Sequence, residues 1–242
     1  MQFDTEQYIF LIDSLPFGLE LLFIACGLFS FFIFYLSSRN TKHALATVLG
    51  TIAWLTIQSF LSSNGFYTDS LSSLPPKIFA FGLLPFNLFI LLSFALPKIR
   101  TGYTAKLGIG YLILLSTVRL PVEIGLAWLA GEGAVPEIMS FHGWNYDIIM
   151  GITAPFFWYF HRKGWLKRSI FIAWNLVGTI LLLTIIITAI LSAPFPFQQL
   201  AFDNPNIAVL YFPYSWLAVF IAPLVLYTHI VMLYQALALK KI

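Results

Sequence analysis

The chain has 242 residues, of which 60% are hydrophobic and only 10% are charged. A soluble globular domain carries about 25% charged residues, so this composition excludes an ordinary soluble protein. Apolar runs close to the roughly 20 residues that cross a bilayer recur along the whole chain. We therefore predict an all-α, polytopic membrane protein whose main partner is the lipid bilayer. The net charge of +3 gives no reason to expect a nucleic-acid partner, because the basic residues follow the membrane topology.

Seven apolar segments are expected to be transmembrane helices of a single domain, residues 1–242. An acidic stretch, residues 1–16, precedes the first helix, and Pro16 suits a helix start because its missing N–H is not needed in the first turn. The fifth segment is short for a span. The predicted helices cover about residues 17–36, 44–61, 78–96, 107–130, 147–160, 169–191 and 214–237.

Cytoplasmic loops of membrane proteins are enriched in lysine and arginine. If the chain alternates sides across seven helices, 11 of its 13 basic residues fall on one side, and the ten acidic residues fall in the opposite half or its loops. We therefore expect the N-terminus outside and the C-terminus in the cytoplasm, in a cell membrane such as the bacterial inner membrane. The basic residues on the cytoplasmic side are Arg39, Lys42, Lys98, Arg100, Lys106, Arg162, Lys163, Lys167, Arg168, Lys240 and Lys241.

Arg119 and Glu123 lie four residues apart inside the fourth predicted helix. At this spacing they share a helix face, and the helical rise places Arg119 roughly 18 Å from the cytoplasmic end. Pro121 between them removes a backbone hydrogen bond, and the resulting kink would open space beside the pair. Charges at this depth usually face a bundle interior or a polar cavity. The pair is either a ligand, ion or proton site or an internal ion pair that fixes helix packing.

Other polar side chains are expected at a similar depth and are candidates for the same ligand site. Gln58 and Asn87 lie in the second and third predicted helices, where hydrogen bonding between helices is the favoured role. Asp147 begins the fifth predicted helix, a position at which its carboxylate is expected to cap the helix.

The two longest loops, residues 131–146 and 194–212, both fall outside and mix aromatic residues with amides and carboxylates. Long ordered loops are often functional. These loops would either cover the helix ends as a lid or lie in the membrane interface. We expect them to contribute His142, Asn145 and Asn206 to an outward-opening pocket whose floor is the charged pair of the fourth helix.

No two histidines share a helix at a spacing of three or four residues, so we predict no metal or haem site and no cofactor. His229 lies deep in the last predicted helix, where a hydrogen-bonded core histidine is favoured, and Asn175 in the sixth helix is its expected partner. Cys26, the only cysteine, is interpreted as a small buried side chain. The small residues around Gly151 are interpreted as a site of close helix packing.

Four functions remain open. A protein that binds or senses a small molecule would use Arg119 for an anionic or polar head group and Glu123 to hold the arginine, with aromatic walls around a lipid-like body. A transporter or proton-coupled carrier would use the same pair, although no inverted repeat is evident. An enzyme acting on a lipid would need Ser140, His142 and Asp147, whose spacing matches no known motif, so no catalytic residue is assigned. The fourth is a scaffold with a purely structural ion pair. The sequence does not predict an oligomeric state.

Overall fold

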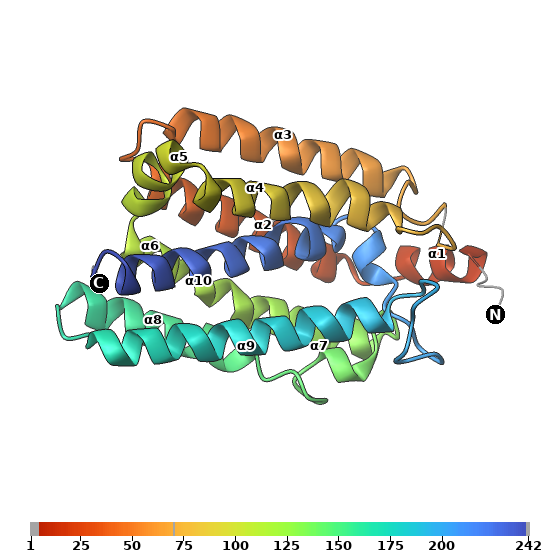
Figure 1. Ribbon diagram of the computed structural model, residues 1–242. Coiled ribbons are helices and arrows are strands. Elements are labelled where there is room, and N and C mark those ends of the chain that lie inside the picture. The colour runs from red at the N-terminus through yellow and green to blue at the C-terminus, as the bar shows by residue number, and fades with distance from the viewer. Residues whose placement is uncertain (1–4, 70, 241–242) are drawn as a thin grey trace.

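The computed structural model describes residues 5–69 and 71–240, and within these residues it contains helices and no strands, which confirms the all-α prediction (Figure 1). Asp4 and Lys241, two residues of the charge pattern, lie outside the described residues. The elements are α1 (Thr5–Asp13), α2 (Phe17–Ser38), α3 (Ala44–Ser63), η1 (Phe79–Leu83), α4 (Leu84–Ala95), α5 (Pro97–Gly102), η2 (Thr104–Lys106), α6 (Ile109–Leu115), η3 (Ser116–Val118), α7 (Arg119–Gly131), η4 (Glu137–Met139), α8 (Ile148–Arg162), α9 (Arg168–Ser192), η5 (Ala208–Leu210), η6 (Leu217–Ile221) and α10 (Ala222–Leu237).

Five helical segments of the described chain are long and apolar enough to cross a membrane, and a sixth qualifies if η1–α4 and α5–η2 are taken together across a bend of 84°. A multi-pass membrane protein is therefore supported, but seven spans are not reached. The fifth predicted span, α8, has only 15 residues, about 22 Å of helix, and a hydrocarbon core is about 30 Å thick. The five segments are Phe17–Ser38, Ala44–Ser63, Ile109–Gly131, Arg168–Ser192 and Leu217–Leu237.

The acidic stretch before the first span forms a helix, α1, that the sequence analysis did not predict. Ile12 within α1 and Leu15 just after it are buried in the hydrophobic core, whereas Phe10 is exposed. Packing of an apolar face supplies the stability that so short a helix lacks in isolation. In Figure 1, α1 lies at the opposite end of the bundle from the end of α10.

The basic segments gather at one end of the bundle. In Figure 1 the turn between α2 and α3, the short helix α5, the turn between α8 and α9 and the end of α10 all lie at that end. Arg168 closes the end of α10, because its Nε donates to the Ala236 carbonyl at 2.7 Å and its Nη2 donates to the Leu237 carbonyl at 3.3 Å. A cation is favourable at these last, unpaired carbonyls of a helix.

Three prolines mark places where the helical hydrogen bonding changes. Pro85 follows the π-helical segment η1, Pro121 follows the 3₁₀ segment η3, and Pro223 follows the π-helical segment η6. Proline has no N–H, and its ring displaces the carbonyl four residues earlier, so it interrupts regular α-helical bonding. The helix before Pro121 is a 3₁₀ turn, and the segment Ile109–Gly131 continues through it as one span.

Carbonyls displaced by two of these prolines accept hydrogen bonds from α3. Gln58 Nε2 donates to the Phe81 carbonyl at 3.0 Å, four residues before the proline of α4. Trp54 Nε1 donates to the Val219 carbonyl at 3.0 Å, four residues before the proline of α10. Lipid offers no alternative donors to such carbonyls, so the two bonds fix α3 against both π-helical segments. The expected role of Gln58 in bonding between helices is confirmed.

The same face of α3 is bound at its far end as well. The Tyr67 hydroxyl, in the loop after α3, donates to Gln58 Oε1, and burial raises the pKa of Tyr67 to about 12. Trp216 Nε1 donates to Ser59 Oγ at 3.0 Å, and Ser215 Oγ donates to Ser62 Oγ at 3.0 Å. Polar side chains therefore hold a helix whose remaining surface is largely exposed and apolar.

The two long loops pack on each other. Asn204 Nδ2 donates to the Val135 carbonyl at 3.1 Å, and the Ala208 N–H donates to the Ala134 carbonyl at 3.2 Å. Ala134, Val135 and Ala208 are all buried. These contacts favour the interpretation that the loops cover the helix ends over the alternative that they spread in the membrane interface.

Helices α7 and α8 approach each other closely at Gly151. A Cβ atom added at Gly151 would lie only 2.3 Å from the backbone nitrogen of Leu120. Small residues permit such approach of helix backbones in membranes. The predicted close packing at Gly151 is thus confirmed.

Replacing Gly151 with alanine is expected to lower the thermal unfolding temperature in detergent, because overpacking costs about 1–3 kcal/mol. Gly50→Ala in α3 is the matched control, since nothing lies within 4 Å of a Cβ atom added there. Alanine in a helix is favoured over glycine by about 1 kcal/mol, so the control should unfold at the same temperature or higher. Circular dichroism measures both variants, and an unchanged Gly151→Ala would contradict the close approach.

Candidate functional site

Arg119 is the centre of a buried polar cluster. Its Nε forms an ion pair with Asp147 Oδ2 at 2.7 Å, and both side chains are almost fully buried. Its Nη2 donates to the Gly178 carbonyl at 2.8 Å, and its Nη1 lies 3.1 Å from His229 Nε2. One guanidinium therefore joins α7, the start of α8, α9 and α10.

The His229 ring connects the arginine to Asn175. Asn175 Nδ2 donates to the Phe171 carbonyl at 2.9 Å, which leaves Asn175 Oδ1 as the acceptor for His229 Nδ1, also at 2.9 Å. The proton is thus assigned to Nδ1, and Nε2 accepts from Arg119. The predicted pairing of His229 with Asn175 is confirmed. The imidazole is neutral in this arrangement and has no nitrogen left for a ligand.

Glu123 does not pair with Arg119 as expected. Its Oε2 accepts a hydrogen bond from Asn145 Nδ2 at 2.7 Å, and the same Nδ2 also donates to the Met139 carbonyl at 2.9 Å. Glu123 lies on the same helix as Arg119 and could meet it only along the helix surface. Asp147, at the start of α8, reaches the guanidinium from a neighbouring element. The prediction of the arginine's partner was therefore wrong, although its burial was predicted.

Asp147 occupies the N-cap position of α8, but its carboxylate does not cap the helix. Oδ2 is bound to Arg119, and Oδ1 is buried without a hydrogen-bond partner. The Asp147 N–H donates to Asn145 Oδ1 at 3.1 Å. The expected capping role is therefore wrong, because the ion pair takes the side chain away from the helix end.

A cavity of about 610 Å³ lies beside this cluster, between α4, α7, α9 and α10. Ligand pockets commonly measure about 300–1,000 Å³ and are mostly apolar with a few placed polar groups. The polar side chains that line this cavity are Asn87, Arg119, Glu123 and Asp147, and the other lining residues are apolar.

All three irregular helical segments next to prolines contribute to the cavity wall. π-Helical segments occur frequently at functional sites, because the extra residue disturbs regular packing. The contributing residues are Phe79, Ala80 and Leu83 of η1, Val118 of η3, and Leu217, Ala218 and Ile221 of η6. The prolines thus determine where the bundle leaves room.

The remaining predicted site residues have different positions. Asn87 is exposed and lines the cavity, but its Nδ2 donates to the Leu83 carbonyl of its own helix at 2.8 Å, so the expected bond between helices is wrong. Gln58 is bound to η1 outside the cavity lining. Asn206 closes the end of α9, where its N–H donates to the Ser192 carbonyl at 2.8 Å and its Nδ2 to the Ala189 carbonyl at 3.1 Å.

His142 lies away from the cluster. It is exposed, and its ring packs against Phe141 with centroids 4.5 Å apart. Ser140 Oγ donates to the Glu137 carbonyl, and Asp147 is bound by the arginine. No hydrogen bond between side chains of the described residues joins Ser140, His142 and Asp147, so the structure gives the lipid-enzyme hypothesis no catalytic triad. Nor do the described residues contain a group of three or more His, Cys, Asp or Glu that could hold a metal ion.

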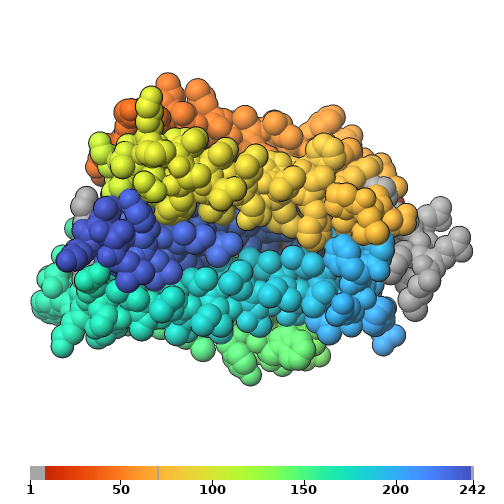
Figure 2. Space-filling view, in the orientation of Figure 1, coloured from red at the N-terminus to blue at the C-terminus, as the bar shows by residue number. Residues whose placement is uncertain are grey.

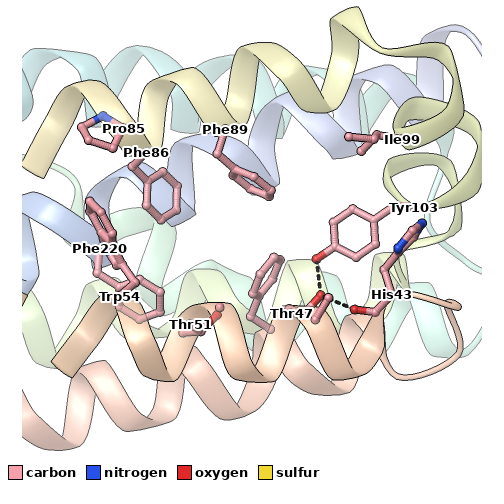
Figure 3. A pocket seen from close by; sticks show the side chains of 13 residues that line it. His43, Thr47, Thr51, Trp54, Pro85, Phe86, Phe89, Ile99, Tyr103 and Phe220 are labelled. Carbon is pink, nitrogen blue, oxygen red and sulfur yellow. Dashed lines mark hydrogen bonds between the residues drawn. The ribbon is translucent and has the colours of Figure 1, made fainter. Parts of the chain in front are cut away.

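A second cavity, of about 470 Å³, is lined mainly by aromatic and small side chains of α3, α4 and α5 (Figure 3). Phe86 and Phe89 extend from α4 toward Trp54 on the opposite side. At one end of the cavity, Thr47 Oγ1 and the Tyr103 hydroxyl are 2.9 Å apart and the His43 ring contacts Tyr103. The described part of the chain contributes no carboxylate, lysine or arginine to this cavity, so it offers fewer charged groups than the cavity beside Arg119.

Sequence reasoning missed Gly178 and the direct contact between Arg119 and His229. A Cβ atom at Gly178 would lie 2.7 Å from His229 Cε1 and 2.5 Å from Met150 Cε. The missing side chain therefore leaves space for the histidine and gives the arginine access to a carbonyl. The sequence does contain a signal for this contact, because Gly178 lies at about the predicted depth of Asn175 and His229.

The partner of Arg119 can be tested with double-mutant cycles of thermal unfolding in detergent. Arg119→Met and Asp147→Asn are each expected to destabilise the protein by about 3–5 kcal/mol, because each leaves a buried charge unpaired. The double variant should lose clearly less unfolding free energy than the sum of the losses of the two single variants. The cycle with Glu123→Gln is the control and should show weaker coupling. Stronger coupling of Arg119 with Glu123 than with Asp147 would contradict the observed pairing.

Similarity to known proteins adds nothing to the description of this site. In comparisons with known proteins, no family model matches the chain, no curated protein is similar to it in sequence, and no solved structure matches its fold.

Proposed function

We propose that this chain is a multi-pass membrane protein that binds a small amphipathic molecule in the cavity beside Arg119. The observation that carries the proposal is the combination of apolar walls with three buried charged side chains, Arg119, Glu123 and Asp147. Charged residues within a membrane are costly and usually serve a function. An apolar body would lie against the walls, and a polar group would contact the charged cluster.

The opening of the cavity supports access from the bilayer. Leu84 and Asn87 of α4 and Leu183 of α9 line the cavity and are also exposed. In Figure 2, α4 in yellow and α9 in cyan lie on either side of α10 in blue. A molecule dissolved in the membrane would pass between α4 and α9, and not through an opening to the outer aqueous side as expected from the sequence.

We further propose that the chain crosses the membrane seven times, with α8 as a short fifth crossing. The helical rise places Arg119 about 15 Å from the start of α6, and Asp147 at the start of α8 contacts it. The loop before α8 would therefore descend into the bundle and complete the crossing. Its residues Met139 and Asn145 are buried, and irregular backbone is tolerated at membrane depth when protein surrounds it.

The orientation follows from the basic end of the bundle. Positive residues favour the cytoplasmic side, so α5, the turn between α8 and α9, and the end of α10 would face the cytoplasm. The acidic helix α1 would then lie outside. We propose a cell membrane, and the bacterial inner membrane in particular, as the location.

A scaffold with a sealed ion pair is the main competing function. The lining of the cavity by Arg119 and Glu123 argues against it, because a purely structural pair needs no adjoining space. No specific observation favours transport or catalysis.

Binding can be measured by native mass spectrometry of the protein released from phosphatidylcholine nanodiscs. The probes are dodecylamine, dodecanol and dodecanoate, which share one apolar chain and differ in the head group. We expect saturable binding of at least one probe to the wild type. Ala189→Phe, on the wall of the cavity, should reduce its affinity at least tenfold by filling the space.

The matched control is Ala53→Phe, which adds the same side chain to an exposed position of α3 and should leave binding unchanged. Unfolding temperatures of both variants show whether they fold. The proposal fails if none of the probes binds, or if a folded Ala189→Phe variant binds as tightly as the wild type.

A further inference from the structure

The chemistry of the cluster indicates which polar group the bound molecule carries, an inference that rests on the proposed function. Asp147 is 3% exposed and lines the cavity, and its Oδ1 has no hydrogen-bond partner. An unsatisfied buried polar atom costs about 1–3 kcal/mol, and more when it is charged. Asp147 therefore brings an unpaired acceptor to the wall of the cavity, and a hydrogen-bond donor would satisfy it.

Glu123 provides a second acceptor. Its Oε2 accepts from Asn145, and no hydrogen bond among the described residues uses its Oε1. The same amide accepts the Asp147 N–H through Asn145 Oδ1. One short side chain thus contacts the Glu123 carboxylate and the Asp147 backbone, and both residues line the same cavity.

The charges of the lining do not balance. Among the described residues that line the cavity, Arg119 is the only cation, and Glu123 and Asp147 are the only anions, so the ionised cluster carries a formal charge of −1. His229 is neutral in its hydrogen-bonding arrangement and does not compensate. A buried charge without a counter-charge is strongly destabilising in a low-dielectric interior. A bound cation would remove this imbalance, whereas an anion would increase it.

Arg119 is already engaged by protein groups. Its Nε forms the ion pair with Asp147, and Nη1 and Nη2 each contact one further group, His229 and the Gly178 carbonyl. A guanidinium has five N–H groups, so these contacts leave one N–H on each terminal nitrogen without an assigned partner. The net charge of the cluster, and not the donors of Arg119, therefore opposes the anionic head group that the sequence alone allowed.

We propose that the cavity binds a molecule with a protonated amine on an apolar body, and that the amine donates hydrogen bonds to Asp147 Oδ1 and to the Glu123 carboxylate. An ammonium group has three donors, no acceptor and one positive charge. These properties match the two acceptors and one unbalanced negative charge. Arg119 acts here as a positioning residue that holds Asp147.

Head-group preference in the wild type tests the proposal. Affinities of dodecylamine, dodecanol and dodecanoate are compared at pH 7 and at equal membrane-bound concentrations in phosphatidylcholine nanodiscs. We expect dodecylamine to bind at least tenfold more tightly than either of the others. Glu123→Gln removes one negative charge but keeps an acceptor for Asn145, so it should fold and lose most of the preference for the amine over the alcohol.

The control for this variant is His142→Gln, at an exposed position away from the cluster, which should keep the wild-type preference. Equal or tighter binding of dodecanoate overturns the inference, and so does equal binding of dodecanol, since a neutral donor would then suffice. In both cases the proposed binding function stands. If none of the three probes binds, the proposed function fails and the inference fails with it. A Glu123→Gln variant that folds and keeps the full preference also overturns the inference.

Discussion

The burial of one guanidinium constrains the arrangement of the whole bundle. Removing Arg119 from water carries a penalty of several kcal/mol, which only well-placed partners offset. Those partners come from the start of α8, from a glycine carbonyl of α9 and from a histidine of α10. The histidine is itself held by Asn175, whose amide group is anchored on its own helix. Four segments must therefore meet at one depth before the arginine is satisfied.

Prolines explain why space remains beside this tightly bound centre. Pro85 and Pro223 each follow a π-helical segment, and those segments form part of the cavity wall. The carbonyls that these prolines displace are taken up by Gln58 and Trp54 of α3. The carbonyls of the irregular backbone are thus hydrogen-bonded by side chains of α3, and the same segments line the cavity. The Phe81 and Val219 carbonyls are therefore paired although their helices are irregular at the cavity.

The sequence predicted what depends on periodicity and composition, and it failed where partners come from different elements. Apolar length predicted the long helices, and depth alone predicted that Asn175 would meet His229. Spacing along one helix suggested Glu123 as the partner of Arg119, but Asp147 takes that place from the end of a loop. The conformation of that loop depends on tertiary contacts, which the sequence does not show. From the sequence alone, an aspartate at a helix start is expected to cap the helix. Seven spans are not confirmed for a similar reason, because α8 alone is too short to count as a span by its length.

The loop before α8 connects the chemistry of the cavity to its architecture. The Asn145 amide donates to the Glu123 carboxylate and to the Met139 carbonyl, and it accepts from the backbone N–H of Asp147. The positions of the two carboxylates are therefore not independent. Asp147 is pulled toward Arg119 on one side and held by Asn145 on the other, which leaves Oδ1 as its only unbound oxygen. The hydrogen bonds that order the loop thus also determine which acceptors remain unpaired beside the cavity.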